Sequence, residues 1–202
     1  MNLMKTTLSL LLVFSLMIFS CESNEQENES NSAPAEQPEV NEWTADDLRG
    51  AALGGDLQTV KESTDQGILV DDTDELGRTA LMFAAFNGHT DVIELLIANG
   101  ADVNAQNDEG RTPLMFAASG PFPEAVSLLL EEGSDVNQSD SVEEWTPLMY
   151  AAAEGNDEVV ALLLEYGANA DAMDTDGETA SDFAQNNGHT QTVALLRNSL
   201  NK

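Results

Sequence analysis

The sequence predicts an all-α repeat solenoid, built from about five helix-turn-helix units that each carry a β-turn finger. The first observation is a fixed period, because Thr79, Thr112, Thr146 and Thr179 follow one another at spacings of 33, 34 and 33 residues. The second is that similar blocks surround these threonines, and such a recurrence indicates stacked repeats. The blocks are GRTALMFAAFNGH from Gly77, GRTPLMFAASGPF from Gly110, EWTPLMYAAAEGN from Glu144 and GETASDFAQNNGH from Gly177.

Each block predicts a short first helix. Thr112 can cap this helix with its hydroxyl, and Pro113 fits the first helical position because the N–H that proline lacks would be unpaired there. Thr146 and Pro147 repeat the pattern. Alanine pairs in the helix let neighbouring backbones approach closely. These pairs are Ala84-Ala85, Ala117-Ala118 and Ala151-Ala152.

A second helix is predicted in each unit, most clearly in residues 77–104. Gly88 ends the first helix there, and apolar residues recur at helical spacing between Thr90 and the stop at Gly100. They are Val92, Ile93, Leu95 and Leu96. An extended finger then leads to a turn at Gly110. Since both helices are shorter than the roughly 12 to 15 residues an isolated helix needs, the core must form between stacked units.

The two terminal units depart from the pattern. In the first, Ala51 and Ala52 lie one period before Ala84-Ala85, but the finger consensus is lost; the last has Ser181 and Asp182 where inner units have Leu-Met. The outer face of a terminal repeat meets solvent, so we expect these two units to be caps. The predicted units are residues 43-76, 77-109, 110-143, 144-176 and 177-202.

These blocks resemble the ankyrin repeat, whose period is about 33 residues and whose signature is T-P-L-H-x-A. The resemblance implies a module that binds other proteins through a concave surface, formed by the finger tips and the exposed side of the first helices. The histidine of the signature is replaced by Met82, Met115 and Met149. A methionine column favours apolar packing along the stack, and the alternative is oxidant scavenging or soft-metal binding.

The chain is strongly acidic. Its 202 residues include 37 Asp and Glu but 7 Lys and Arg, which gives a formal net charge of -30. Such a field repels phosphate backbones, so nucleic acid is not an expected partner. The acidity either serves solubility alone or attracts a basic partner or cations.

Residues 1-20 predict an export signal. Lys5 precedes the apolar run Leu8 to Phe19, which is shorter than the roughly 20 apolar residues of a membrane span. The sequence IFSC, from Ile18 to Cys21, resembles the lipobox of bacterial lipoproteins. This resemblance implies that Cys21, the single cysteine, becomes the lipidated first residue of the mature protein. A free thiol or an intermolecular disulfide are the alternatives.

Residues 21-42 comprise this cysteine and a predicted tether. From Glu22 to Glu42 the segment contains seven Glu and no basic residue. It has too few apolar residues to form a core and its like charges repel, so we expect it to be disordered. Together these segments predict an exported protein anchored by lipid in the bacterial cell envelope, in the outer membrane or periplasm or at the cell surface.

The sequence contains no pattern typical of an enzyme or of a cofactor site. It lacks G-x-S-x-G, H-E-x-x-H, a phosphate loop and a G-x-G-x-x-G fingerprint. His89 and His189 each follow a glycine in the turn between two helices, where we expect them to bridge backbone groups of that turn. We therefore predict neither catalysis nor a cofactor.

Two carboxylate runs leave cation binding open. They are Asp71–Glu75 and Asp171–Glu178. The second run fails the EF-hand pattern, because Ala172 and Phe183 would fall at its first and last ligand positions. Solvated finger loops are the favoured interpretation, and weak cation binding is the alternative.

The resemblance to ankyrin repeats also implies which residues contact a protein partner. They are the finger-tip and first-helix positions of each unit: Leu76, Arg78, Phe86, Asn87, Asp108, Glu109, Arg111, Ser119, Glu143, Trp145, Glu154, Asp176 and Glu178, with Trp43 and Leu53 at the equivalent places of the first unit.

Four of the singled-out residues have two interpretations each. Trp145 stands where neighbouring units have Arg78 and Arg111, and it is the leading candidate for a partner contact; the alternative is packing on the adjacent finger. The two arginines either hold a partner's carboxylate or, as we expect, tie adjacent acidic fingers together. Phe122, between two prolines that replace the Gly-His turn, either fills a gap, which is favoured, or anchors a partner.

The sequence thus predicts a monomeric, non-enzymatic module that binds a protein partner. The identity of the partner is not predicted, and a basic protein is one option. The alternatives are a metal-binding or enzymatic envelope protein, and a structural or stress-related lipoprotein without a single partner.

Overall fold

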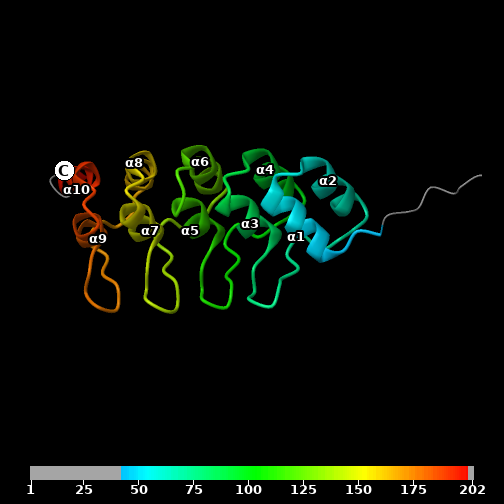
Figure 1. Cartoon of the computed structure of the whole chain (residues 1–202), viewed down its shortest axis with the longest axis horizontal. Helices are drawn as coiled ribbons and strands as arrows, with labels where there is room; N and C mark the ends of the chain where they lie inside the picture. Colours follow the sequence, from blue (N-terminus) through cyan, green and yellow to red (C-terminus); the bar gives the residue numbers. More distant parts are fainter. Residues whose placement is uncertain (1–41, 200–202) are drawn as a thin grey trace, which may run out of the picture. The chain divides into compact units, whose positions relative to one another are not determined.

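The computed structural model describes residues 42–199, and within them it confirms the predicted all-helical solenoid. Five helix pairs succeed one another in this range (Figure 1). The first helices are α1 (Ala45–Gly54), α3 (Ala80–Phe86), α5 (Pro113–Ala118), α7 (Pro147–Glu154) and α9 (Ala180–Asn186). The second helices are α2 (Leu57–Asp65), α4 (Thr90–Ala98), α6 (Pro123–Glu131), α8 (Asp157–Glu165) and α10 (Thr190–Ser199). The predicted signal, Cys21 and the tether as far as residue 41 lie outside the described residues.

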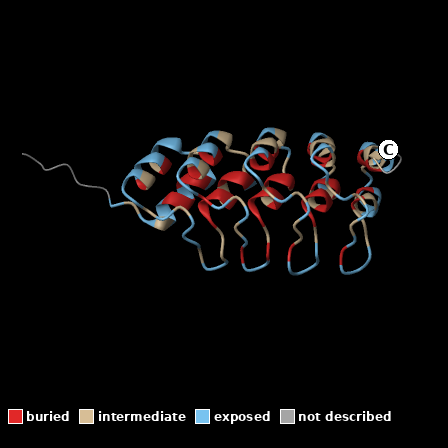
Figure 2. Ribbon diagram, turned by 180° about the vertical axis from the view of Figure 1, so that it is seen from behind, coloured by how far each residue is buried: buried red, intermediate tan, exposed pale blue. Residues whose placement is uncertain are grey.

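The helices form two parallel rows. The first helices stack side by side, α1 on α3, α3 on α5, α5 on α7 and α7 on α9, while the second helices form another row, seen above them in Figure 1. The fingers project from the first-helix row on the side away from the second helices. Most buried residues lie in the first helices and on the sides of the second helices that face them (Figure 2).

Threonine caps start the first helices, as predicted. The Oγ of Thr112 accepts a hydrogen bond from the N–H of Met115 at 3.4 Å, and Thr79, Thr146 and Thr179 act in the same way. In the other direction, the Met115 sulfur lies 3.4 Å from the N–H of Thr112. In the last unit Asp182 replaces this methionine and forms a complete capping box with Thr179. Thr44 and Asp47 form such a box at α1, two residues before the register of the other capping threonines.

The methionine column is buried, which confirms the apolar-packing interpretation. Met82, Met115 and Met149 are each 1% exposed. Arg49 lies one period before Met82 and is also buried; it forms ion pairs with Asp46 on its own helix and with Asp72. In the first unit Arg49 therefore takes the place of the methionine, and its charge is paired with two solvent-exposed carboxylates.

The two histidines link consecutive repeats. His89 Nε2 lies 3.1 Å from the carbonyl oxygen of Leu53, and the side-chain amide of Asn87 donates to the same oxygen at 2.7 Å. His189 and Asn187 contact the Ala153 carbonyl in the same way, at 3.1 and 2.8 Å. The expectation of a backbone bridge is confirmed, but its location was wrong, because the acceptor belongs to the preceding repeat rather than to the histidine's own turn.

Phe122 fills the space that His89 and His189 occupy in two of the other turns. Its ring packs so closely on the preceding turn that a methyl group added to Gly88 would lie 2.4 Å from it, and it belongs to the partly buried residues that pack on the core. The gap-filling interpretation of Phe122 is thus confirmed.

A side-chain oxygen of an asparagine or aspartate holds the turn of each finger. The Asn107 side-chain oxygen accepts hydrogen bonds from the N–H groups of Glu109 and Arg111, at 3.0 and 2.8 Å. Asp74, Asp140 and Asp174 occupy equivalent places and accept the same kind of bonds. One carboxylate of each of the two runs, for which weak cation binding was the alternative to a solvated loop, therefore holds a finger turn.

Candidate functional site

An aromatic column runs along the finger side of the first helices. Its members are the fourth residues after the capping threonines, namely Phe83, Phe116, Tyr150 and Phe183. All four are partly exposed and rest on the buried core. Because a first helix presents the same side to the fingers in every repeat, residues one period apart line up along the stack.

The residues just before Thr79, Thr112 and Thr146 lie against this column. The Arg78 guanidinium lies 4.7 Å from the centre of the Phe83 ring, and that of Arg111 lies 5.7 Å from the Tyr150 ring. Trp145 packs against Tyr150 and Phe183, with ring centres 5.2 and 4.4 Å apart. Trp145 thus closes the C-terminal half of the column.

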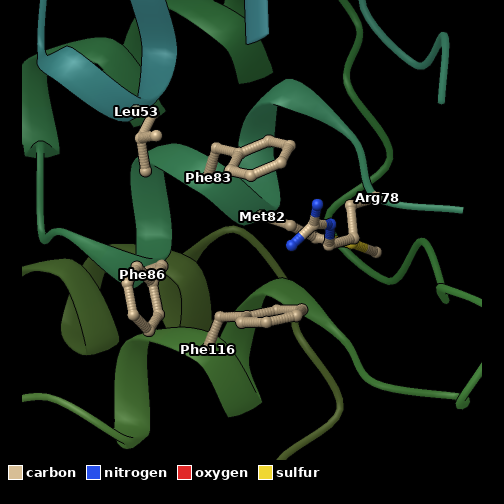
Figure 3. A pocket seen from close by; sticks show the side chains of 6 residues that line it. All are labelled: Leu53, Arg78, Met82, Phe83, Phe86 and Phe116. Carbon is tan, nitrogen blue, oxygen red and sulfur yellow. The ribbon is translucent and has the colours of Figure 1, made fainter. Parts of the chain in front are cut away.

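The N-terminal half of the column is open. A hollow of about 270 Å³ lies there, and Figure 3 shows its lining, with Leu53 from α1, Met82, Phe83 and Phe86 from α3, Phe116 from α5, and Arg78 from the preceding finger. Phe86 is 50% exposed and Leu53 is 38% exposed. The rings of Phe86 and Phe116 meet edge to face, with centres 6.4 Å apart. Large apolar side chains left in solvent around a hollow are typical of a site that another molecule covers.

The structure brings three of the sequence-predicted residues, Leu53, Arg78 and Phe86, into this hollow. A neighbouring hollow between the first two fingers gathers Leu76, Arg78, Asp108, Glu109 and Arg111 with Phe116 and Asn107. The remaining predicted positions line neither of these hollows; they are Trp43, Asn87, Ser119, Glu143, Trp145, Glu154, Asp176 and Glu178. Of these, Asn87 takes part in the repeat-to-repeat hydrogen bond described above.

The two arginines do not tie adjacent fingers together, so that expectation was wrong. Arg78 forms an ion pair with Asp74 at 2.7 Å, and Arg111 with Glu109 at 3.1 Å, both within the arginine's own finger. The finger turn places these partners two or four residues apart on the same side. Between repeats, Arg111 acts instead through the Tyr150 ring of the next unit.

Trp145 rests on two rings of the first helices, Tyr150 of its own repeat and Phe183 of the next. It is partly buried, and its indole nitrogen is shielded from solvent without a hydrogen-bond partner. A side chain in this position contributes to packing between the third and fourth full repeats. The exposed centre of the candidate site is therefore Phe86, and partner contact by Trp145 stays a prediction.

Sequence reasoning missed Phe83 and Phe116 as site residues. The signal that could have found them is their shared register with Tyr150 and Phe183, since an aromatic recurs at the variable position of all four full repeats. Their exposure, however, depends on the residue before each threonine and on Leu53 of the preceding repeat.

Asp140 and Tyr150 form a polar support beneath the closed half of the column. The Tyr150 hydroxyl donates to the Asp140 carboxylate at 2.7 Å, and the N–H groups of Val142 and Glu143 donate at 3.1 and 2.9 Å. Burial opposes the charge of Asp140, but these hydrogen bonds outweigh it and hold its pKa below the ordinary value of 3.8. Burial, reinforced by the bond to Asp140, raises the pKa of Tyr150. This pair is a structural support for Arg111 and Trp145.

Within residues 42–199, no group of three or more His, Cys, Asp or Glu side chains is arranged to hold a metal ion. In the same range no helix has the length and apolar character of a membrane span.

Comparison with protein families decides the classification. The model for ankyrin repeats in three copies matches residues 48–140 and again residues 118–202. The chain is an ankyrin-repeat protein. A search of curated proteins finds no match. Ankyrin repeats generally mediate protein–protein interaction and are typically non-enzymatic. Membership of the family thus implies a protein partner, without identifying it. The open half of its aromatic column lies on the face that the family resemblance implies.

Proposed function

We propose that this ankyrin-repeat protein binds another protein at the bacterial cell envelope, with the hollow between α1, α3 and α5 as the centre of contact. The observation that supports it most is the exposure of Phe86 and Leu53 beside Phe83 and Phe116. Aromatic side chains in a partly desolvated hollow are typical of residues that dominate binding energy. The stack orders these side chains before binding, so little conformational entropy is lost on association.

The binding proposal is tested by affinity capture from the native envelope with the double variant Leu53→Ser, Phe86→Ser. We expect the specific partner to be depleted about tenfold or more, because truncating central apolar contacts typically weakens binding by that factor. Circular dichroism and the melting temperature should stay near those of the parent, since both side chains are exposed.

The matched control is Tyr166→Ser, which removes a 42% exposed aromatic at the end of α8, away from the hollow. This control should capture the partner as well as the parent does. Equal capture by the parent and the double variant would contradict the proposed site.

The envelope location is a separate part of the proposal, supported by the resemblance of residues 18–21 to a lipobox. We expect Cys21→Ser to abolish incorporation of radiolabelled palmitate and to release the protein from the membrane fraction. An acylated, membrane-bound Cys21→Ser product would show that another residue anchors the chain.

A further inference from the structure

The apolar hollow continues on its finger side into two charged hollows. One is lined by Glu75, Leu76 and Arg78, and the other by Leu76, Arg78 and Asp108. Arg78 lines all three hollows, so they adjoin one another at this side chain, and the three together are called the groove. Leu76 is exposed between the two charged hollows.

The arginines of this groove are already neutralised. Arg49 pairs with Asp46 and Asp72, Arg78 with Asp74, and Arg111 with Glu109. Each guanidinium is thereby compensated by at least one carboxylate, and Arg78 also lies over the Phe83 ring. The groove therefore offers no free positive charge to an acidic ligand.

Two carboxylates in the groove lack such compensation. No basic side chain of residues 42–199 lies within ion-pair distance of Glu75 or Asp108. They flank Leu76 from successive fingers, and the Asp108 carboxylate lies against the preceding finger tip, where a methyl group on Gly77 would be 2.8 Å from its Oδ1. An exposed apolar side chain thus stands between two uncompensated negative charges.

Charge decides between the possible occupants. A second copy of the chain would bring a net charge of -30 against the same charge, and the segment from Glu22 to Glu42 is itself acidic. Both would be repelled from Glu75 and Asp108. A cationic segment would be attracted, and the apolar hollow would select one that also carries large apolar side chains.

The geometry points to an extended segment of a basic protein partner, in which an aliphatic or aromatic residue is flanked by lysine or arginine. The apolar side chain enters the hollow beside Leu53 and Phe86, and the flanking cations meet Glu75 and Asp108. This inference rests on the proposed function and adds the chemistry of the partner to it.

The test uses the full chain and three labelled peptides of about nine residues, followed by fluorescence anisotropy. The first alternates lysine and leucine, the second has glutamate in place of lysine, and the third has serine in place of leucine. We expect the lysine-leucine peptide to bind at least about tenfold more tightly than the other two, since it alone meets both the charge and the hollow.

Two pairs of variants then locate the site. Leu53→Ser, Phe86→Ser and separately Glu75→Gln, Asp108→Asn should each weaken this peptide several-fold, the second mainly at low salt. The control Glu131→Gln, Glu132→Gln removes the same charge from exposed positions at the end of α6 and should have little effect. Loss of binding in the control equal to that in Glu75→Gln, Asp108→Asn would overturn the inference, because it would reduce binding to net charge alone.

The inference and the proposed function fail differently. Equal binding of the lysine-serine peptide, tighter binding of the glutamate-leucine peptide, or no binding of any peptide would each overturn the partner chemistry. In these cases envelope capture that still depends on Leu53 and Phe86 would leave the proposed function standing. If envelope capture is also independent of Leu53 and Phe86, the partner chemistry and the proposed function are both overturned.

Discussion

At position 145 a tryptophan stands where two other repeats have arginine, and its larger side chain covers the C-terminal half of the aromatic column. Arg78 and Arg111 cover one ring each, whereas Trp145 packs against both Tyr150 and Phe183. The same register position therefore serves packing in one repeat and leaves a ring accessible in another.

Trp145→Ala should destabilise the protein. We expect a loss of about 1 to 3 kcal/mol in the free energy of unfolding, because a partly buried aromatic loses its contacts with two rings. Urea denaturation followed by circular dichroism measures this loss. Trp43→Ala, at the start of the first unit, is the control and should cost less. An unchanged midpoint for Trp145→Ala would place Trp145 outside the core and restore it as a partner contact.

Lowered pKa values make the fold sensitive to acid. The pKa of Asp140 lies below 3.8 in the folded protein, so its charged form contributes stability above that pH, and this contribution is lost as the pH falls through the folded pKa. Hydrogen bonds from Thr44 and Thr179 lower the pKa of Asp47 and Asp182, which act in the same direction.

Asp140→Asn tests the acid dependence. At pH 7 we expect it to cost about 1 to 3 kcal/mol of unfolding free energy, because a buried charged acceptor of three hydrogen bonds is replaced by a neutral one. Between pH 5 and pH 2 (about the range of ordinary and lowered carboxyl pKa values) its stability should fall less steeply than that of the parent. Parallel pH profiles would show that Asp140 does not contribute to the acid transition.

At the scale of the element, the turn between α3 and α4 depends on a glycine that no other residue can replace cheaply. Gly88 has φ +68°, and an added methyl group would also lie 2.4 Å from the Phe122 ring. Gly100 has φ +91° but nothing within 4 Å of such a group. The two glycines separate backbone strain from steric overlap.

Gly100→Ala should cost about 1 to 2 kcal/mol, the usual penalty for a side chain in the left-handed region. Gly88→Ala should cost about 2 to 5 kcal/mol, because the Phe122 ring must also move. Thermal and urea unfolding of the two variants measure the difference. Equal losses of unfolding free energy in the two variants would mean that the Phe122 ring can move aside at no cost and does not hold the two repeats together.

The elements themselves were predictable from sequence because their determinants are local. Thr112 and Pro113 specify a helix start within a few residues, and the period of 33 or 34 specifies the stack. The partners of His89 and Arg78 were not predictable in the same way. His89 bonds to Leu53, 36 residues earlier, and Arg78 turns to Asp74 because the finger backbone folds back on itself.

The candidate site was predictable in part for the same reason. Phe86 and Arg78 followed from their register in the repeat, but the hollow forms only where Leu53 of one repeat meets Phe83 of the next and Phe116 of the one after. Conversely, Trp145 is conspicuous in the sequence as an aromatic among acidic residues, yet two rings from different helices cover it. Exposure is a property of the stack rather than of one repeat.

At the scale of the whole molecule, the charge of -30 opposes the compact state. We expect the melting temperature to rise with sodium chloride, since salt screens repulsion between exposed carboxylates beyond a Debye length of about 10 Å at 0.1 M. Calorimetry over a salt series measures this. A further, saturable rise at micromolar calcium would indicate a specific cation site and revive the metal-binding alternative.

The central claim is that the open half of the aromatic column is where a protein partner binds. Its most direct test is a photo-cross-linking amino acid placed at Phe86 and, in a separate chain, at Tyr166, followed by irradiation of intact cells. The account predicts one discrete adduct of defined mass from position 86 and none of that mass from position 166. Adducts from position 166 alone, or the same products from both positions, would contradict it.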